Sequence, residues 1–157
     1  MSVFSRLSSL FGSSPKPAQP AAVPESLRVL IVDDESDVRD LLTRLLTARG
    51  HETFAVDSGA AALPLLRRLR FDVMLCDVKM EEMSGLELLP HAMTIDPSLA
   101  VVMLTGMNDV ATATAAVAGG ALDYLVKPVE MKDLERAIKR AADRRRLEKE
   151  HRRLRTG

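Results

Sequence analysis

Residues 71–85 read F-D-V-M-L-C-D-V-K-M-E-E-M-S-G, and this stretch decides the fold. Its apolar run from Val73 to Cys76 has the length and composition of a buried β-strand. Asp77 stands at the end of that run, and a polar loop ending in Ser84-Gly85 leads into a helical pattern. A carboxylate at the carboxyl end of a buried parallel strand faces the crevice in which open α/β sheets bind ligands. Asp77 is therefore the first candidate functional residue; the alternative is that it only caps its loop.

Three other apolar strands also end in polar groups. Residues 27–32 are followed by Asp33-Asp34-Glu35, residues 100–104 by Thr105-Gly106, and residues 122–126 by Lys127-Pro128. Strand and helix patterns alternate along the chain, which predicts parallel β-α units. In a parallel sheet these strand ends gather at one edge, so we expect the polar groups to meet there.

The intervening patterns predict five strands and five helices in an open, doubly wound sheet with right-handed crossovers. Ser36 is the expected N-cap of the first helix, and Gly50 is its expected left-handed stop. A short edge strand is expected at residues 52–56. The other helices are expected at about 60–69, 86–94, 110–118 and from Met131 onward. Pro64 and Pro90 should kink or shorten the helices that contain them.

Four motifs resemble the receiver domain of bacterial two-component response regulators, in particular the chemotaxis-regulator type. They are L-I-V-D-D-E, L-C-D-V-K-M-x-x-M-S-G, V-M-L-T-G and D-Y-L-V-K-P, within residues 27–144. The resemblance implies a flavodoxin-like fold, with a five-stranded parallel sheet in the order 2-1-3-4-5. An extended helix should follow at the C-terminus.

The clustered side chains suggest phosphoryl chemistry. Carboxylates of Asp33, Asp34 and Asp77 in one crevice would repel one another, and a hard cation such as Mg²⁺ relieves that cost. The alternative is a hydrogen-bonded acidic cluster without metal. Lys127 is a compact cation that can meet a phosphoryl oxygen, and Thr105 offers a hydroxyl donor. Gly106 leaves the site open and offers its backbone N–H.

The resemblance assigns more specific roles. It makes Asp77 the acceptor of a phosphoryl group and the backbone carbonyl of Lys79 a ligand of Mg²⁺. It also makes the Lys127-Pro128 peptide bond cis. Thr105 and Tyr124 would form the switch, on a face made by the 110–118 helix, the strand bearing Tyr124 and the last helix. The family often has proline where this chain has Glu81, so the loop is expected to be looser.

The position of Lys79, two residues after Asp77, lets its side chain reach the mouth of the crevice. We predict that Lys79 and Met107 set the lifetime of the phosphorylated state by controlling the approach of water.

Composition limits the wider possibilities. The chain has 22 basic and 22 acidic residues, so its net charge of zero argues against a whole-protein field for nucleic acid or membrane. Cys76 is the single cysteine, which fits a reducing cytoplasm, and no apolar run reaches membrane-spanning length. We expect a flexible tail and proline-rich linker at 1–25, a receiver domain at 26–144 and a charged helical extension at 145–157. The tail has one cation, Arg6, before the linker, which argues against membrane contact.

The extension carries Leu147 and Leu154 seven residues apart, with His151 between them. This stripe can join two copies in a homodimer or belong to a solvated helix. Its arginines are interrupted by glutamates and lack aromatic neighbours, so there is no strong signal for nucleic acid.

The sequence therefore predicts a phosphorylation-switched signalling domain rather than an enzyme, located in the cytoplasm. Its phosphoryl donor would be a histidine kinase or a phosphotransfer protein, and its downstream protein partner is not identified. One alternative is the front portion of a longer regulator. Others are a metal-dependent phosphohydrolase, a DNA-binding regulator and a scaffold with a silent site. Lys79 counts against the phosphohydrolase, because such enzymes commonly hold an acid at that position.

Overall fold

The structure, a computed structural model, describes residues 25–156. The amphipathic stretch and nearly all of the linker expected at residues 1–25 lie outside the described residues. The elements are β1 (Arg28–Val32), α3 (Ser36–Ala48), β2 (Glu52–Val56), α4 (Gly59–Arg68), β3 (Val73–Asp77), α5 (Gly85–Ile95), β4 (Ala100–Thr105), the 3₁₀ helix η1 (Met107–Asp109), α6 (Val110–Ala118), β5 (Asp123–Val126) and α7 (Met131–Thr156).

The strands form one parallel sheet in the order β2-β1-β3-β4-β5, which confirms the predicted fold. The register explains how the sheet builds a site. Val32 pairs with Cys76, so the residues that follow them, Asp33 and Asp77, lie level with each other. Thr105 pairs with Val126, so Lys127 follows directly beside β4. The carboxyl ends of four strands thus deliver their polar residues to one edge.

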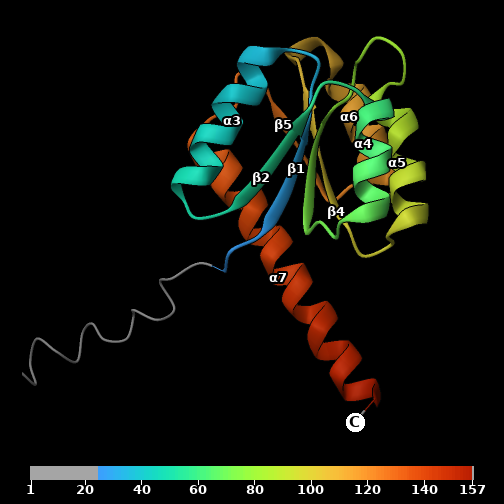
Figure 1. The fold of residues 1–157 in the computed structure, drawn as a ribbon. Coiled ribbons are helices and arrows are strands. Elements are labelled where there is room, and N and C mark those ends of the chain that lie inside the picture. The colour runs from blue at the N-terminus through green and yellow to red at the C-terminus, as the bar shows by residue number, and fades with distance from the viewer. Residues whose placement is uncertain (1–24, 157) are drawn as a thin grey trace, which may run out of the picture.

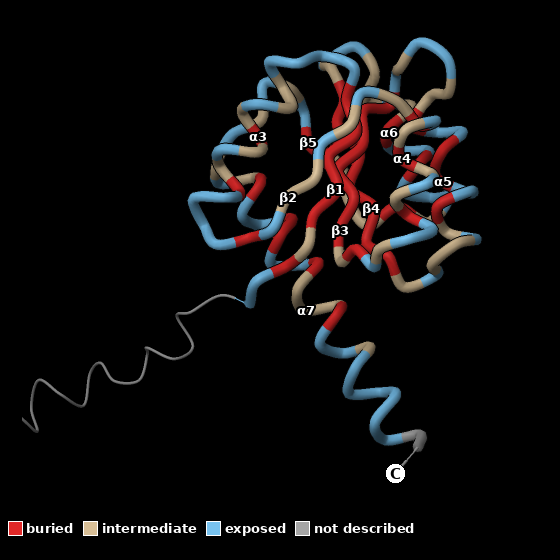
Figure 2. Tube along the Cα trace, in the orientation of Figure 1, coloured by how far each residue is buried: buried red, intermediate tan, exposed pale blue. Residues whose placement is uncertain are grey.

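Helices cover both faces of the sheet, with α3 and α7 on one side and α4, α5 and α6 on the other (Figure 1). Alternate residues of β1 enter opposite cores: Leu30 and Val32 face α4 and α5, whereas Val29 and Ile31 face α3 and α7. Figure 2 shows the central strands buried along their length. Burial on both faces explains why β1, β3 and β4 read as nearly continuous apolar runs.

The first helix begins differently from our expectation. Ser36 is the first residue of α3 and not its N-cap; Glu35 holds the cap position, and no side chain caps the helix there. The prediction that Ser36 is the N-cap was therefore wrong. Glu35 is the last residue with an extended backbone, and the helical conformation begins at Ser36. Gly50 ends the helix at φ +90°, as predicted, in a conformation that glycine adopts without steric cost.

The two prolines do not end their helices. Both α4 and α5 run past Pro64 and Pro90, and their bounds agree with the predicted ones to within one residue. Each proline is exposed, so water can reach the carbonyl that loses its partner. The Pro90 carbonyl also accepts a hydrogen bond of 2.9 Å from Thr94 Oγ1.

Helix α7 packs against the sheet and then continues beyond the domain (Figure 1). Its buried stripe of Leu134, Ala137, Ile138 and Ala141 ends at Arg145, which is only 4% exposed. Beyond this point Leu147 and Leu154 are 66% and 72% exposed. No helix within residues 25–156 is both long and apolar enough to cross a membrane.

A polar network holds Arg145 at the amino edge of the sheet. Arg145 Nε donates to Asp72 Oδ1 at 2.8 Å and Nη1 donates to Ser98 Oγ at 3.0 Å. The other oxygen of Asp72 accepts the backbone N–H of Arg28 at 2.8 Å. The network joins α7 to the starts of β1, β3 and β4, and it lies at the opposite edge from the predicted site.

Candidate functional site

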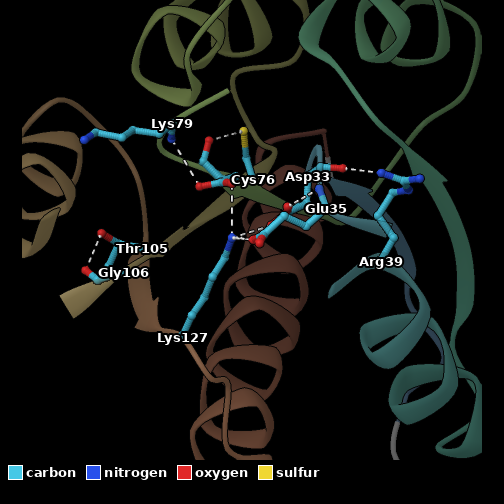
Figure 3. Close-up of polar contacts among 9 residues, drawn as sticks. Asp33, Glu35, Arg39, Cys76, Lys79, Thr105, Gly106 and Lys127 are labelled. Atoms are coloured by element: carbon cyan, nitrogen blue, oxygen red, sulfur yellow. Dashed lines mark hydrogen bonds and ion pairs between the residues drawn. The ribbon is translucent and has the colours of Figure 1, made fainter. Parts of the chain in front are cut away.

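A lysine and three carboxylates meet at the carboxyl edge of the sheet. The Lys127 ammonium lies 2.8 Å from Asp33 Oδ2, 3.1 Å from Asp77 Oδ2 and 3.0 Å from Glu35 Oε1 (Figure 3). Thr105 ends the neighbouring strand and is fully buried. The Lys127 backbone N–H donates to the Thr105 carbonyl at 2.7 Å. Lys127 and the three carboxylates thus come from three strand ends and form one cluster, next to the end of β4.

The Asp77 carboxyl group is buried, with 6% of the residue exposed. This burial, followed by the negative charge of Asp33, raises the pKa of Asp77 from 3.8 to about 6. The backbone N–H of Lys79 donates to Asp77 Oδ1 at 3.1 Å, and this bond and the Lys127 ammonium act in the opposite direction. At neutral pH the carboxylate is therefore charged but poorly solvated, which suits a nucleophile.

Lys127 is a stable cation in this setting. Burial on its own would lower the pKa of Lys127, but its close contacts with the Asp33 and Glu35 carboxylates and the surrounding negative charge outweigh it. The pKa of Lys127 is therefore held above its ordinary value, and the ammonium stays charged beside Asp77. The following peptide bond, Lys127-Pro128, is cis, as the resemblance implied.

Oxygen atoms of Asp33, Glu35 and Asp77 lie within 4.8 Å of one another, close enough to share a metal ion. Asp33 Oδ2 is buried, and apart from the ion pair with Lys127 it meets no donor in good hydrogen-bond geometry. An oxygen-only donor set with a buried, incompletely paired carboxylate fits a hard cation such as Mg²⁺.

The acidic run after β1 divides differently from our expectation. The cluster contains Asp33, Glu35 and Asp77, and Asp34, predicted as a metal ligand, lies outside it; both Asp34 and Glu35 are exposed. The Glu35 backbone N–H donates to Asp33 Oδ1 at 2.9 Å, and Arg39 Nη1 donates to the Asp33 carbonyl at 2.7 Å. These bonds fix the turn that carries the acids. A ligand role for Asp34 stays a prediction.

Thr105 and Gly106 lie beside the carboxylates without contacting them. The Thr105 hydroxyl donates to the Gly106 carbonyl at 3.1 Å. A Cβ placed on Gly106 would have Asp109 Oδ2 as its nearest neighbour, at 3.8 Å, so the space in front of Gly106 is open. Tyr124 is half-buried on β5 and packs against the core that contains α5 and α6. The roles predicted for these residues remain untested.

Gly85 is a site residue to which we had assigned no role. A Cβ at Gly85 would collide with the backbone carbonyl of Asp77, so only glycine fits behind the candidate nucleophile. The Gly85 N–H donates to the Val78 carbonyl at 3.0 Å. Helix α5 starts here with a capping box formed by Ser84 and Glu87, and this anchors the loop after Asp77.

The fold and this cluster define a class: a doubly wound α/β domain with a buried carboxylate and a lysine at the carboxyl edge of its sheet. The model of the response regulator receiver domain matches residues 29–139. The chain therefore belongs to the response regulator receiver family. Domains of this family are phosphorylated by histidine kinases in two-component systems.

Curated relatives are longer proteins. Transcriptional regulatory protein ZraR of Klebsiella oxytoca is 37% identical over 123 residues, which cover 78% of this chain and 28% of that protein. Response regulator protein FleR of Pseudomonas aeruginosa is 42% identical over 115 residues, which cover 73% of this chain and 24% of that protein. The chain thus spans about a quarter of the length of these relatives.

Solved structures show the same fold. A response regulator receiver domain protein from Clostridium thermocellum has a TM-score of 0.73 at 35% identity, covering 77% of this chain and 98% of that one. NtrX from Brucella abortus, in a structure with ADP, has a TM-score of 0.79 at 31% identity, covering 83% of this chain and 30% of that one.

Proposed function

We propose that Asp77 accepts a phosphoryl group from the phosphohistidine of a histidine kinase or a phosphotransfer protein. The observation that carries this proposal is the contact of 3.1 Å between the buried Asp77 Oδ2 and the Lys127 ammonium in the acidic cluster. A carboxylate oxygen of Asp77 forms the new O–P bond as the P–N bond of the donor breaks. The electron pair returns to the imidazole nitrogen, which takes a proton from water.

The cation for this step would be Mg²⁺. Asp33 and Asp77 would hold it, together with the Lys79 carbonyl and one further acid, Asp34 or Glu35. Support comes from the spacing of the carboxylate oxygens of Asp33, Glu35 and Asp77. When bound, Mg²⁺ supplies positive charge to the phosphoryl oxygens, which phosphoryl transfer needs more than it needs acid–base catalysis.

Three groups would hold the transferred phosphoryl group. Lys127 would exchange part of its contact with the carboxylates for a phosphoryl oxygen, and Gly106 would donate its backbone N–H. The Thr105 hydroxyl would leave the Gly106 carbonyl, to which it now donates, and turn toward the phosphoryl group. Support comes from the open space at Gly106 and from the position of Thr105 beside β5.

Movement of Thr105 would let Tyr124 turn inward, and this would change the face formed by α6, β5 and α7. Support comes from the half-buried state of Tyr124 and from its packing against the core that contains α5 and α6. We propose this face as the site for a downstream protein and place the protein in the cytoplasm. The transcriptional role named for ZraR belongs to a protein of which this chain spans 28%, and DNA binding is not carried over.

The experiment combines Mg²⁺ with acetyl phosphate and follows the intact mass of the protein. Wild type should gain the mass of one phosphoryl group, and Asp77→Asn should not. Glu82→Gln serves as a control, because Glu82 is exposed in the same loop and makes no ion pair among the described residues. Phosphorylation of Asp77→Asn at the wild-type rate, or none in the wild type, would refute the proposal.

A further inference from the structure

An ion pair joins the segments that follow β3 and β4. Lys79 Nζ lies 3.0 Å from Asp109 Oδ1. Lys79 belongs to the loop after β3, whereas Asp109 is the last residue of η1 and directly precedes α6. The pair therefore joins the loop that follows the candidate nucleophile to the start of a helix on the proposed output face.

Both partners are tied to the phosphoryl site through their backbones. The Lys79 N–H donates to Asp77 Oδ1 at 3.1 Å, and the Asp109 N–H donates to the Gly106 carbonyl at 3.0 Å. Asp109 Oδ2 is also the atom nearest to the open space at Gly106. A negative charge thus stands near Gly106, whose backbone N–H is proposed to bind the phosphoryl group, and the Lys79 ammonium pairs with it.

Asp109 has a second possible use for its carboxylate. It occupies the N-cap position of α6, and aspartate is among the residues that cap helices best, yet its side chain makes no capping hydrogen bond. The carboxylate is only 24% exposed and is directed to Lys79, whose side chain is 72% exposed. The side chain therefore has one observed partner, the Lys79 ammonium, and its N-cap position offers a second, the first amides of α6.

We infer that Asp109 is a regulatory positioning residue that exchanges Lys79 for the N-terminus of α6 when Asp77 is phosphorylated. Before phosphorylation, Asp109 holds the Lys79 ammonium away from Asp77. A phosphoryl group on Asp77 attracts Lys79 and repels Asp109, and the released carboxylate caps α6. Phosphorylation is thereby transmitted to the start of α6 through a single change of partner. This inference rests on the proposed function.

The two partners should affect α6 in opposite directions without any phosphoryl donor. Lys79→Met frees the Asp109 carboxylate to cap α6, so hydrogen exchange at the first-turn amides of α6 should slow. Asp109→Ala removes both the ion pair and the side chain that could cap α6, so the same amides should exchange no more slowly than in wild type. A purely structural ion pair would loosen the segment in both variants, and that result would overturn the inference.

Phosphorylation kinetics give the second readout. With acetyl phosphate and Mg²⁺, Asp109→Asn should raise the initial rate about two- to five-fold, the range that breaking an exposed ion pair supports. In a Lys79→Met background the same substitution should change the rate less than in wild type, because the ammonium that it frees is gone. Glu82→Gln should match wild type. Equal effects of Asp109→Asn in both backgrounds would overturn the inference.

The outcomes separate this inference from the proposed function. If the wild type takes up no phosphoryl group, the proposed function fails, while hydrogen exchange still decides whether Asp109 changes partners. If the wild type is phosphorylated and Asp109→Asn behaves as Glu82→Gln does, the inference fails and the proposed function stands.

Discussion

Replacing Asp77 by asparagine should make the protein more stable at neutral pH. The burial that prepares this carboxylate for reaction also places a poorly solvated negative charge beside Asp33. Asparagine has nearly the same shape, and its Oδ1 can still accept the Lys79 N–H. The contact with the Lys127 ammonium is weakened, but that group keeps Asp33 and Glu35 as partners.

The magnitude follows from the pKa of Asp77. A rise from 3.8 to about 6 corresponds to about 3 kcal/mol, at about 1.4 kcal/mol for each tenfold change in proton affinity. That value is an upper limit, and in Asp77→Asn the Lys127 ammonium also loses one partner. We therefore expect the free energy of unfolding of Asp77→Asn to exceed that of wild type by about 1 to 2 kcal/mol at neutral pH. The native state binds the proton more tightly than the unfolded state does. The stability that Asp77 contributes is therefore complete below pH 3.8 and is lost as the pH rises through about 6.

The assay is urea unfolding, monitored by circular dichroism at several pH values between 4 and 8. The buffer contains a chelator that removes divalent cations. The difference in the free energy of unfolding between Asp77→Asn and wild type should be small at the acid end and reach its full value by neutral pH. Added Mg²⁺ should then stabilise wild type more than the variant. Glu81→Gln controls for removal of a charge from the same loop. A less stable Asp77→Asn at neutral pH, or a difference that does not grow with pH, would refute the reasoning.

Three further substitutions test the surrounding structure. Arg145→Met removes both hydrogen bonds to Asp72 and Ser98 and should cost about 2 to 4 kcal/mol in urea unfolding, because it leaves a partly buried carboxylate without its cation. The control is its exposed neighbour Arg146: Arg146→Met should change the free energy of unfolding by about 0.5 kcal/mol or less. Gly85→Ala should displace the Asp77 carbonyl and lower the rate of phosphorylation by acetyl phosphate as well as stability, whereas a wild-type rate would contradict the crowding seen here. The pKa of His51 is lowered first by burial and then by the charge of Arg49, and its Nδ1 accepts the Leu27 N–H. The stability that His51 contributes is therefore present above pH 6.5 and is lost on acidification. In urea unfolding at several pH values, His51→Gln should lose less stability on acidification than wild type does.

The sequence predicted the sheet and the gathering of polar strand ends because both follow from periodicity. Apolar runs that end in Asp33, Asp77, Thr105 and Lys127 define parallel strands, and a parallel register brings their ends together. Such a pattern does not say which of several consecutive acids turns inward. That choice depends on the turn after β1, where the Glu35 N–H bonds to Asp33 Oδ1.

The burial of Arg145 was missed for a related reason. In the sequence it is the middle one of three consecutive arginines, and we placed it in the solvated extension. What distinguishes it is its position on the helix, one turn after Ala141 on the buried stripe, and the presence of Asp72 at the start of β3. The second fact lies 73 residues away, so local reasoning could not find it. Gly85 was missed because the crowding that requires glycine arises from the Asp77 backbone in the folded chain.

The positions of Lys127 and of the Arg145 network lead to an expectation about α7. The helix begins at Met131, shortly after Lys127, and its buried stripe ends at Arg145 in the network at the opposite edge of the sheet. A rearrangement around Lys127 therefore reaches the first turn of α7, while the last packed turn is held by Asp72. We expect beryllofluoride with Mg²⁺ to change hydrogen exchange in the first turns of α7 and to leave the amides around Arg145 unchanged. In Arg145→Met the change should extend past residue 145, whereas in Arg146→Met it should not. A change that spans α7 equally in wild type would mean that the helix moves as one rigid body and that the Arg145 network does not hold it.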